Sequence, residues 1–303
     1  MKLIYLMVAA SLSLLLSGMG LAINATITHY PGNNHCPPAV GVCFIILLLI
    51  YAGSYLHFGL KSAWTVRIQT FIFFFLVIVV LLIATNAIQF TPFKPIDPAL
   101  MAINDALGIN LLNIIHWTNT HPCIKSILEA TYKSLTYQVA YLPVVLIAVG
   151  RLEVVREYLF LMLVTAIMGY CFYYFFPTTA PASMLNSSLF NEMQHATGLK
   201  FYQIHHYIQP TTFEGGMIAL PSFHVIWAWL CVYLIRAWPI ACALLTIVNT
   251  VMVLSCVLLG WHYPIDLLGS VIILLLGHAV CSYIKKSTAE HHEKERYLTA
   301  FYI

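Results

Sequence analysis

Long apolar runs recur along the chain, separated by short polar breaks. A helix that crosses a bilayer needs about 20 predominantly apolar residues. Runs of this kind predict eight membrane spans, at residues 3–23, 39–60, 68–90, 134–150, 157–176, 219–236, 239–260 and 264–284. The fourth and sixth are the shortest of these runs. The pattern therefore predicts an all-α polytopic membrane bundle of about eight spans.

The first apolar run has two interpretations. Lys2 precedes it, and small residues follow near Ala22 and Ala25, as in a cleaved secretory signal. Alternatively, the run is a retained span. We expect three regions: amino-terminal spans at 1–90, a membrane domain that carries the chemistry at 91–284, and a charged cytoplasmic tail at 285–303.

Composition excludes the soluble classes of protein. Hydrophobic residues make up 61% of the chain and charged residues 8%, whereas a soluble domain has about 25% charged residues. The net charge of +3 comes from 14 basic and 11 acidic residues, which are too few for a polybasic nucleic-acid face. We therefore expect no nucleic-acid partner, and the sequence leaves the oligomeric state open.

The distribution of lysine and arginine predicts the orientation of the spans, because cytoplasmic loops collect these residues. With a cytoplasmic amino terminus, ten basic residues, including every arginine, fall inside and four fall outside. The four outer residues are Lys94, Lys125, Lys133 and Lys200. Both chain ends are then cytoplasmic, and two long segments, 91–133 and 177–218, face outward.

The first long outer segment is itself apolar at regular intervals. Leucine and isoleucine recur at Leu100, Ile103, Leu107, Leu111, Leu112 and Ile115. This spacing predicts an amphipathic helix lying in the membrane interface. Such a helix could be a connector that covers the bundle, or it could help to form an entrance for lipids.

The eighth span begins with a histidine and an aspartate that can share one helix face. His262 and Asp266 are four residues apart, and Pro264 suits a first helical turn. A carboxylate that accepts from one ring nitrogen fixes the tautomer and leaves the other nitrogen free as a nucleophile. A capped helix with a hydrogen-bonded interfacial histidine would produce the same pattern.

A second histidine begins the sixth span at the same predicted depth. Pro221 and Ser222 precede His224, as expected at a helix start, where free N–H groups can bind an anion. His224 could protonate a leaving alkoxide while His262 attacks phosphorus. Phosphoryl transfer through a phosphohistidine would need no metal and no cofactor.

These segments resemble a known family. PSFH and HYPID are similar to the second and third signatures of the type 2 phosphatidic acid phosphatase superfamily. The chain more closely resembles its inositol phosphorylceramide synthase-like (inositolphosphotransferase) branch, in which corners like FPTTAP, PSFH and GWHYPID occur in this order over about residues 95–284. The resemblance implies a six-helix core, with His262 as nucleophile, Asp266 as its partner and His224 as general acid and base. It also implies that Ser222 and Pro221 shape the phosphate site.

The chain departs from the phosphatase signatures at two positions. Phe223 stands in place of a glycine, and Cys256 in place of an arginine six residues before the nucleophile. Without an arginine on the outer face, the phosphate charge must be balanced by other groups. Candidates for this role are Lys200, His205 and His206 from the outer loops. Tyr132 and Lys133, near the start of the fourth span, could also reach the site and bind the substrate.

The sequence thus predicts a membrane enzyme that acts on a phospholipid at the extracytoplasmic face. Water as acceptor would make it a lipid phosphatase, and a ceramide-like or sugar alcohol would make it a head-group transferase of sphingolipid metabolism. Similarity of residues 104–138 to bacterial members favours a bacterial inner membrane over a eukaryotic secretory pathway. The alternative is a transporter or channel whose histidines relay protons, which predicts charged residues in the middle of spans.

Overall fold

The computed structural model describes residues 2–31, 37–212, 215–216 and 218–301, with side chains described as far as residue 290. This part of the chain is helical and contains no strand. The long helices are α1 (Leu3–Ile23), α2 (Ala39–Phe58), α3 (Ala63–Ala87), α6 (Pro122–Ala148), α7 (Leu152–Phe175), α11 (Pro239–Leu258) and α12 (Pro264–Phe301). Shorter helices are α4 (Asp97–Ala106), α5 (Leu111–Thr120), α8 (Pro181–Met184), α9 (Glu192–His205) and α10 (Phe223–Leu234).

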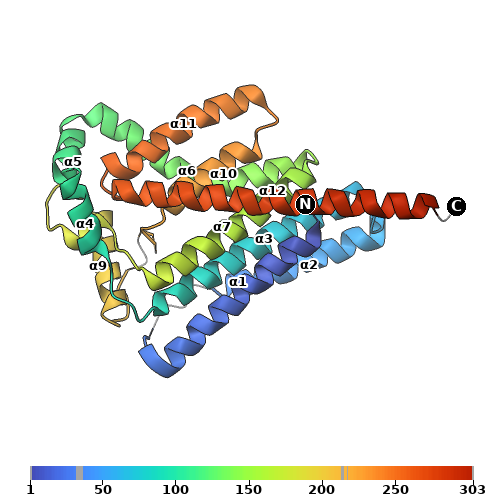
Figure 1. Cartoon of the computed structure of the whole chain (residues 1–303), viewed down its shortest axis with the longest axis horizontal. Coiled ribbons are helices and arrows are strands. Elements are labelled where there is room, and N and C mark those ends of the chain that lie inside the picture. The colour runs from blue at the N-terminus through green and yellow to red at the C-terminus, as the bar shows by residue number, and fades with distance from the viewer. Residues whose placement is uncertain (1, 32–36, 213–214, 217, 302–303) are drawn as a thin grey trace.

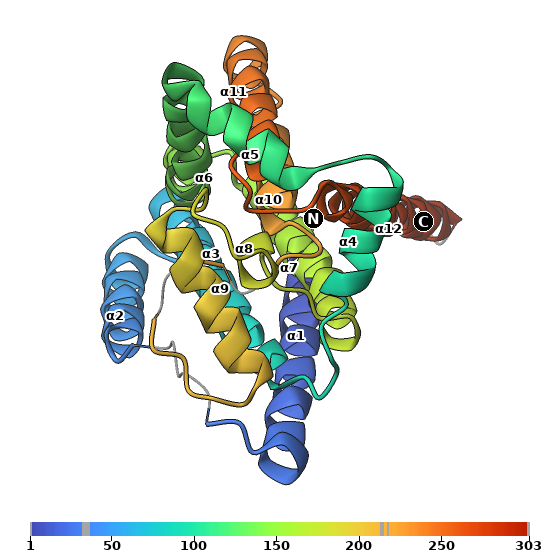
Figure 2. The same cartoon turned by 90° about the vertical axis from the view of Figure 1, so that its left-hand side faces the viewer.

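The long helices form a bundle that is closed at one end. In Figure 1 they run side by side, while α4, α5 and α9 gather at the left and the carboxyl end of α12 projects at the right. Seen from the left in Figure 2, α4, α5, α8 and α9 lie across the ends of the long helices. We call this the capped end and the opposite one the far end.

The predicted all-α polytopic bundle is confirmed, with two differences in its spans. Six of the described helices are long and apolar enough to cross a membrane. The fourth predicted span, 134–150, is the second half of α6, which begins at Pro122 with a more polar stretch. The sixth, 219–236, contains a helix of only 12 residues, because Pro221 and the loop before it are not helical.

The predicted amphipathic helix between Leu100 and Ile115 is two helices. The chain breaks between α4 and α5, whose axes differ by 78°. Gly108 lies at the break with φ +69°, a conformation that glycine adopts without steric cost. Three of the apolar positions, Leu100, Leu111 and Ile115, are buried, whereas Ile103 and Leu107 are exposed. The spacing could not reveal the bend.

Helix α7 occupies the centre of the bundle, and its packing explains how the capped end is held together. Side chains from Val155 to Tyr173 are buried on most of its surface. Its Gly169 lies against the loop before α10, where an added Cβ would meet Phe223 at 2.8 Å and Pro221 at 3.0 Å. Since no larger residue fits without displacement, α7 directly supports the segment that carries His224.

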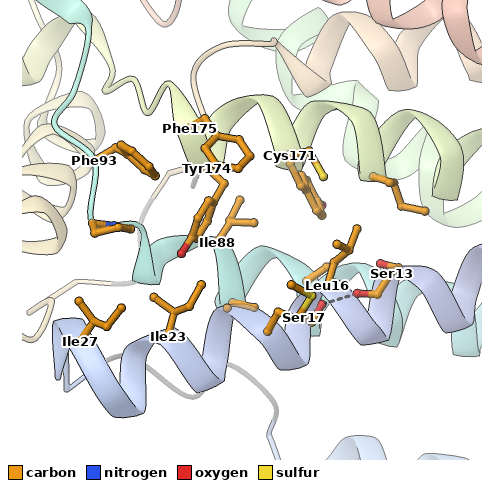
Figure 3. Close-up of a pocket in the computed structure, with 17 residues that line it drawn as sticks. Ser13, Leu16, Ser17, Ile23, Ile27, Ile88, Phe93, Cys171, Tyr174 and Phe175 are labelled. Atoms are coloured by element: carbon orange, nitrogen blue, oxygen red, sulfur yellow. Dashed lines mark hydrogen bonds between the residues drawn. The ribbon is translucent and has the colours of Figure 1, made fainter.

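An apolar groove lies on another side of α7. Figure 3 shows it between α1, the end of α3 and α7, with a volume of about 350 Å³. Ile23, Ile88 and Phe175 are among its lining residues, and the Ser17 hydroxyl donates to the Ser13 carbonyl at 2.7 Å within it. The groove is separate from the segments that carry His224 and His262, because neither histidine lines it.

An ionic cluster joins three helices nearer the far end. The buried carboxylate of Glu157 on α7 pairs with Arg236 at 3.2 Å and with Lys285 at 2.6 Å, and it accepts a hydrogen bond from the Tyr233 hydroxyl. The Arg236 guanidinium also lies over the Tyr233 ring. These contacts tie α7 to the end of α10 and to α12, which continues as a helix into the predicted charged tail.

Candidate active site

The PSFH and HYPID segments meet at the capped end. Ser222 is the N-cap residue of α10, His262 lies in the loop between α11 and α12, and Asp266 lies in the first turn of α12. The Ser270 hydroxyl on α12 donates to the carbonyl of Ser222 at 2.9 Å and to that of Asp266 at 2.8 Å. This hydroxyl fixes the start of α10 against the start of α12.

His262 has a defined partner on each ring nitrogen. Its Nδ1 lies 3.2 Å from Oδ2 of Asp266, and its Nε2 lies 3.2 Å from the Ser222 hydroxyl. The Tyr263 N–H donates to the same Oδ2 at 2.9 Å, which holds the carboxylate in place. With Nδ1–H donating to Asp266, the lone pair of Nε2 points toward Ser222 and is available as a nucleophile.

Burial keeps this imidazole uncharged. His262 is only 4% exposed, and desolvation lowers its pKa to about 4, because burial disfavours the charged form. The ring is therefore neutral at physiological pH, which is the form that can attack an electrophile.

The loop that carries His262 has a backbone that only glycine accommodates. Gly260 has φ +82°, and a Cβ there would lie 2.5 Å from Cδ1 of Ile115 and 3.1 Å from the Phe190 ring. The turn that follows is closed by the N–H groups of Trp261 and His262, which donate to the Cys256 carbonyl at 3.0 and 2.9 Å. Gly260 thus places His262 beside the start of α10.

His224 comes to the same place from α10. The centroids of the His224 and His262 rings are 5.7 Å apart. Tyr132 of α6 stacks on His224 at 4.5 Å, and Trp261 stacks on Tyr132 at 5.4 Å. The two histidines that the sequence places at separate helix starts therefore converge, and an aromatic stack holds the second one.

A pocket of about 510 Å³ adjoins His224. Lys125, Glu129 and Lys133 line it from one face of α6, where they are spaced four residues apart. Its other walls come from α5, α9 and the α11–α12 loop, and include Thr118, Asn119, Leu189, Asn191, Gln194, Leu259 and Trp261. The pocket thus combines two cations and one carboxylate with aromatic side chains and with aliphatic ones such as Ile115, Met193 and Leu258.

The structure divides the predicted substrate-binding residues into two groups. Tyr132 and Lys133 line the pocket together with His224. Pro221 and Ser222 shortly precede His224 in the sequence and are not among the lining residues. Lys200, His205 and His206 on α9 and just after it are not among the lining residues.

Each of those three side chains has other partners. Lys200 is 1% exposed and donates to the Gly215 carbonyl at 2.9 Å. His205 lies 3.3 Å from the Tyr173 hydroxyl, and desolvation lowers its pKa to about 4. His206 stacks on Tyr202 at the surface. These positions do not support the expectation that the three side chains balance the phosphate charge. Hydropathy and charge along the sequence do not show which side chains of α9 are buried by packing.

Sequence reasoning missed several polar residues near the site. Lys125 and Glu129 fall in the predicted outward segment 91–133, and the structure places them on α6, where they line the pocket. Asp97 was not singled out, although its buried carboxylate accepts from the Thr179 N–H at 2.9 and 3.0 Å. The spacing of the polar residues on α6 was the only available signal for the first pair. The sequence around Asp97 contains no such signal, since its partner Thr179 is 82 residues away along the chain.

The comparisons with known proteins agree with this geometry at the level of the family. The PAP2 superfamily model matches residues 98–280, a range that includes Ser222, His224, His262 and Asp266. No curated protein and no solved structure matches the chain. The match supports the superfamily and does not single out the inositol phosphorylceramide synthase-like branch. Because it covers more than half of the chain, the protein belongs to the PAP2 superfamily, and this membership supports a phosphatase-type lipid enzyme of the membrane.

Proposed function

We propose that this protein transfers a phosphoryl or phospho-head group from a membrane phospholipid through a phosphohistidine at His262. The observation that carries the proposal is the meeting of His262, its partner Asp266 and the second histidine, His224, around the start of α10. A nucleophile with an orienting carboxylate and a separate proton donor is the set of groups that covalent catalysis requires.

In the first step, Nε2 of His262 attacks phosphorus. The N–P bond forms as the P–O bond to the leaving group breaks, and His224 gives the departing oxygen its proton. Asp266 stabilises the positive charge that develops on the His262 ring. In the second step, water or an alcohol attacks phosphorus, His224 takes its proton, and the N–P bond breaks to restore His262.

The phosphate would be held by the start of α10. Free N–H groups at a helix start bind anions, and the Ser222 hydroxyl lies beside Nε2 of His262. Lys133 lines the pocket together with His224 and can balance the remaining negative charge. This arrangement would replace the arginine that Cys256 displaces in the phosphatase signature.

The pocket beside His224 has room for an acceptor larger than water. A water molecule occupies about 30 Å³ in the liquid, whereas the pocket beside His224 measures about 510 Å³. Its two lysines and its carboxylate can bind the polar groups of a head group or an acceptor alcohol, and its apolar side chains can contact the rest of a lipid. We therefore propose the inositol phosphorylceramide synthase-like branch, with a ceramide-like or sugar alcohol as the acceptor.

The position of the basic residues supports an extracytoplasmic site. Arg67 lies near Gly150, at the junctions of α2 with α3 and of α6 with α7. The ionic cluster with Arg236 and Lys285 lies near the same junction, because its Glu157 is close to the start of α7, just after Gly150. Helices α4, α5 and α9 gather at the opposite end of the bundle (Figure 1). Because basic residues remain on the cytoplasmic side, we propose that the far end is cytoplasmic and the capped end faces the periplasm or lumen.

The test is release of phosphate from a short-chain phosphatidic acid by the detergent-solubilised protein. His262→Ala should abolish release, and Asp266→Asn should lower it, at unchanged expression. His121→Ala is a matched control, since this exposed histidine stacks on Trp117 and does not line the pocket.

Exchange of a labelled head group between phospholipids and alcohols, followed by thin-layer chromatography, then separates transfer from hydrolysis. Wild-type activity in His262→Ala would exclude the phosphohistidine.

A further inference from the structure

A buried carboxylate outside the two histidine segments is connected to them. Asp97 at the start of α4 is fully buried, and both its oxygens accept from the Thr179 N–H, at 3.0 and 2.9 Å. The neighbouring Ile96 N–H donates to the Pro177 carbonyl at 2.9 Å. The start of α4 therefore holds the corner at 177–181, which follows α7.

That corner in turn holds the loop before α10. The Thr178 hydroxyl, also fully buried, accepts from the Leu220 N–H at 2.8 Å. Pro221 has no N–H group, so the Leu220 N–H is the last backbone donor before Ser222. The position of Ser222 thus depends on a bond to the corner that Asp97 fixes.

The connection ends on the proposed nucleophile. The Ser222 hydroxyl lies 3.2 Å from Nε2 of His262. Successive contacts therefore run from Asp97 through Thr179, Thr178 and Leu220 to the pair of groups that would bind and attack the phosphate. The FPTTAP sequence, which two prolines alone would mark as a helix stop, supplies the middle of this connection.

We propose that Asp97 and Thr178 are positioning residues for phosphoryl transfer, which set the Ser222 hydroxyl against the His262 ring without touching the substrate. This inference rests on the proposed function. It follows from the geometry because a buried N–H without an acceptor is unfavourable, so the loop would move to find another partner. A displacement of about 1 Å at an active site can cost about 100-fold in rate.

The experiment measures kcat and KM on short-chain phosphatidic acid for Asp97→Ala, Asp97→Asn and Thr178→Val. Rates are expressed per folded site, with folded protein measured by size-exclusion chromatography. We expect Asp97→Ala and Thr178→Val each to lower kcat by about 10- to 100-fold with KM changed by less than about threefold. Asp97→Asn should stay within about fivefold of wild type, because its amide oxygen still accepts from the Thr179 N–H.

Two comparisons separate positioning from a role in folding alone. The double variant Asp97→Ala/Thr178→Val should be no slower than the slower single variant, because residues that act through one connection are not additive. Asp105→Ala is the control, since this exposed residue lies on the same helix. Thr178→Val keeps the side-chain volume and tests the proposal if Asp97→Ala does not fold.

Wild-type kcat per folded site in Asp97→Ala and Thr178→Val, or in Thr178→Val when Asp97→Ala does not fold, would overturn the positioning role. Multiplicative losses in the double variant would also overturn it. Failure of the proposed function gives a different result, in which His262→Ala is as active as wild type.

Discussion

The rings of His224 and His262 lie with their centroids 5.7 Å apart and an interplanar angle of 68°. They reach this position from the start of α10 and from the loop before α12, and only His262 has a carboxylate partner. His224 instead stacks on Tyr132 and lines the pocket. This difference in surroundings supports the proposal that the two rings act in different steps, with His262 as nucleophile and His224 as proton donor.

If His224 supplies the proton for the leaving group, the effect of removing it depends on that group. His224→Gln should slow release from a lipid phosphate about 100- to 10,000-fold, the usual contribution of general acid catalysis. A nitrophenyl phosphate has a leaving group that needs no proton, so its single-turnover burst should fall by less than tenfold. Equal losses with both substrates would assign His224 to binding instead.

The neutral state of His262 predicts an unusual pH dependence. Acidification protonates a histidine, and the protonated ring cannot act as a nucleophile. With an ordinary pKa of about 6.5, about a tenth of the histidine would still be neutral at pH 5.5. Burial lowers the pKa of His262 to about 4, so the loss moves to lower pH. The burst rate with nitrophenyl phosphate should be nearly constant between pH 8 and pH 5.5. A fall of about tenfold between pH 8 and pH 5.5 would show an ordinary pKa.

The sequence predicted the all-α bundle and the convergence of PSFH with HYPID, because hydropathy and helix-start chemistry are local. It did not predict the bend at Gly108 or the true start of α6, since these depend on packing at the capped end. The wall formed by Lys125 and Glu129 was missed for the same reason. Lys200 shows the limit most clearly, because nothing in its sequence neighbours indicates that its side chain turns inward.

Lys133 provides the nearest test of how the phosphate charge is balanced. Lys133→Met removes a cation from the pocket beside His224, and a hydrogen bond to a charged group contributes about 1.5–3 kcal/mol. We expect KM for phosphatidic acid to rise by about 10- to 100-fold with a smaller change in kcat. Lys94→Met is the matched control, because Lys94 is exposed and does not line the pocket. An unchanged KM would show that Lys133 does not balance the phosphate charge, and the N–H groups at the start of α10 would then have this role alone.

Gly260 tests whether the shape of the His262 loop matters. Gly260→Ala should lower kcat at least tenfold, because the added Cβ meets Ile115 and Phe190 in addition to the strain at φ +82°. Gly108→Ala is an informative control, since Gly108 also has a positive φ but nothing lies within 4 Å of an added Cβ. Backbone strain in Gly108→Ala should lower the free energy of unfolding by about 1–2 kcal/mol, while kcat stays at the wild-type value. Similar kcat values for Gly260→Ala and Gly108→Ala would mean that the loop carrying His262 accommodates the added methyl group.

The ionic cluster around Glu157 should stabilise the bundle without contributing to catalysis. Glu157→Gln leaves Arg236 and Lys285 without their carboxylate, and the loss should be about 1–3 kcal/mol, between the values for buried and for exposed pairs, because both cations are partly exposed. Thermal unfolding in detergent, followed by tryptophan fluorescence, should show a lower Tm. The kcat per folded site should match wild type, since the cluster joins α7, α10 and α12 away from the pocket. Loss of kcat at unchanged Tm would instead show that the cluster is coupled to the capped end.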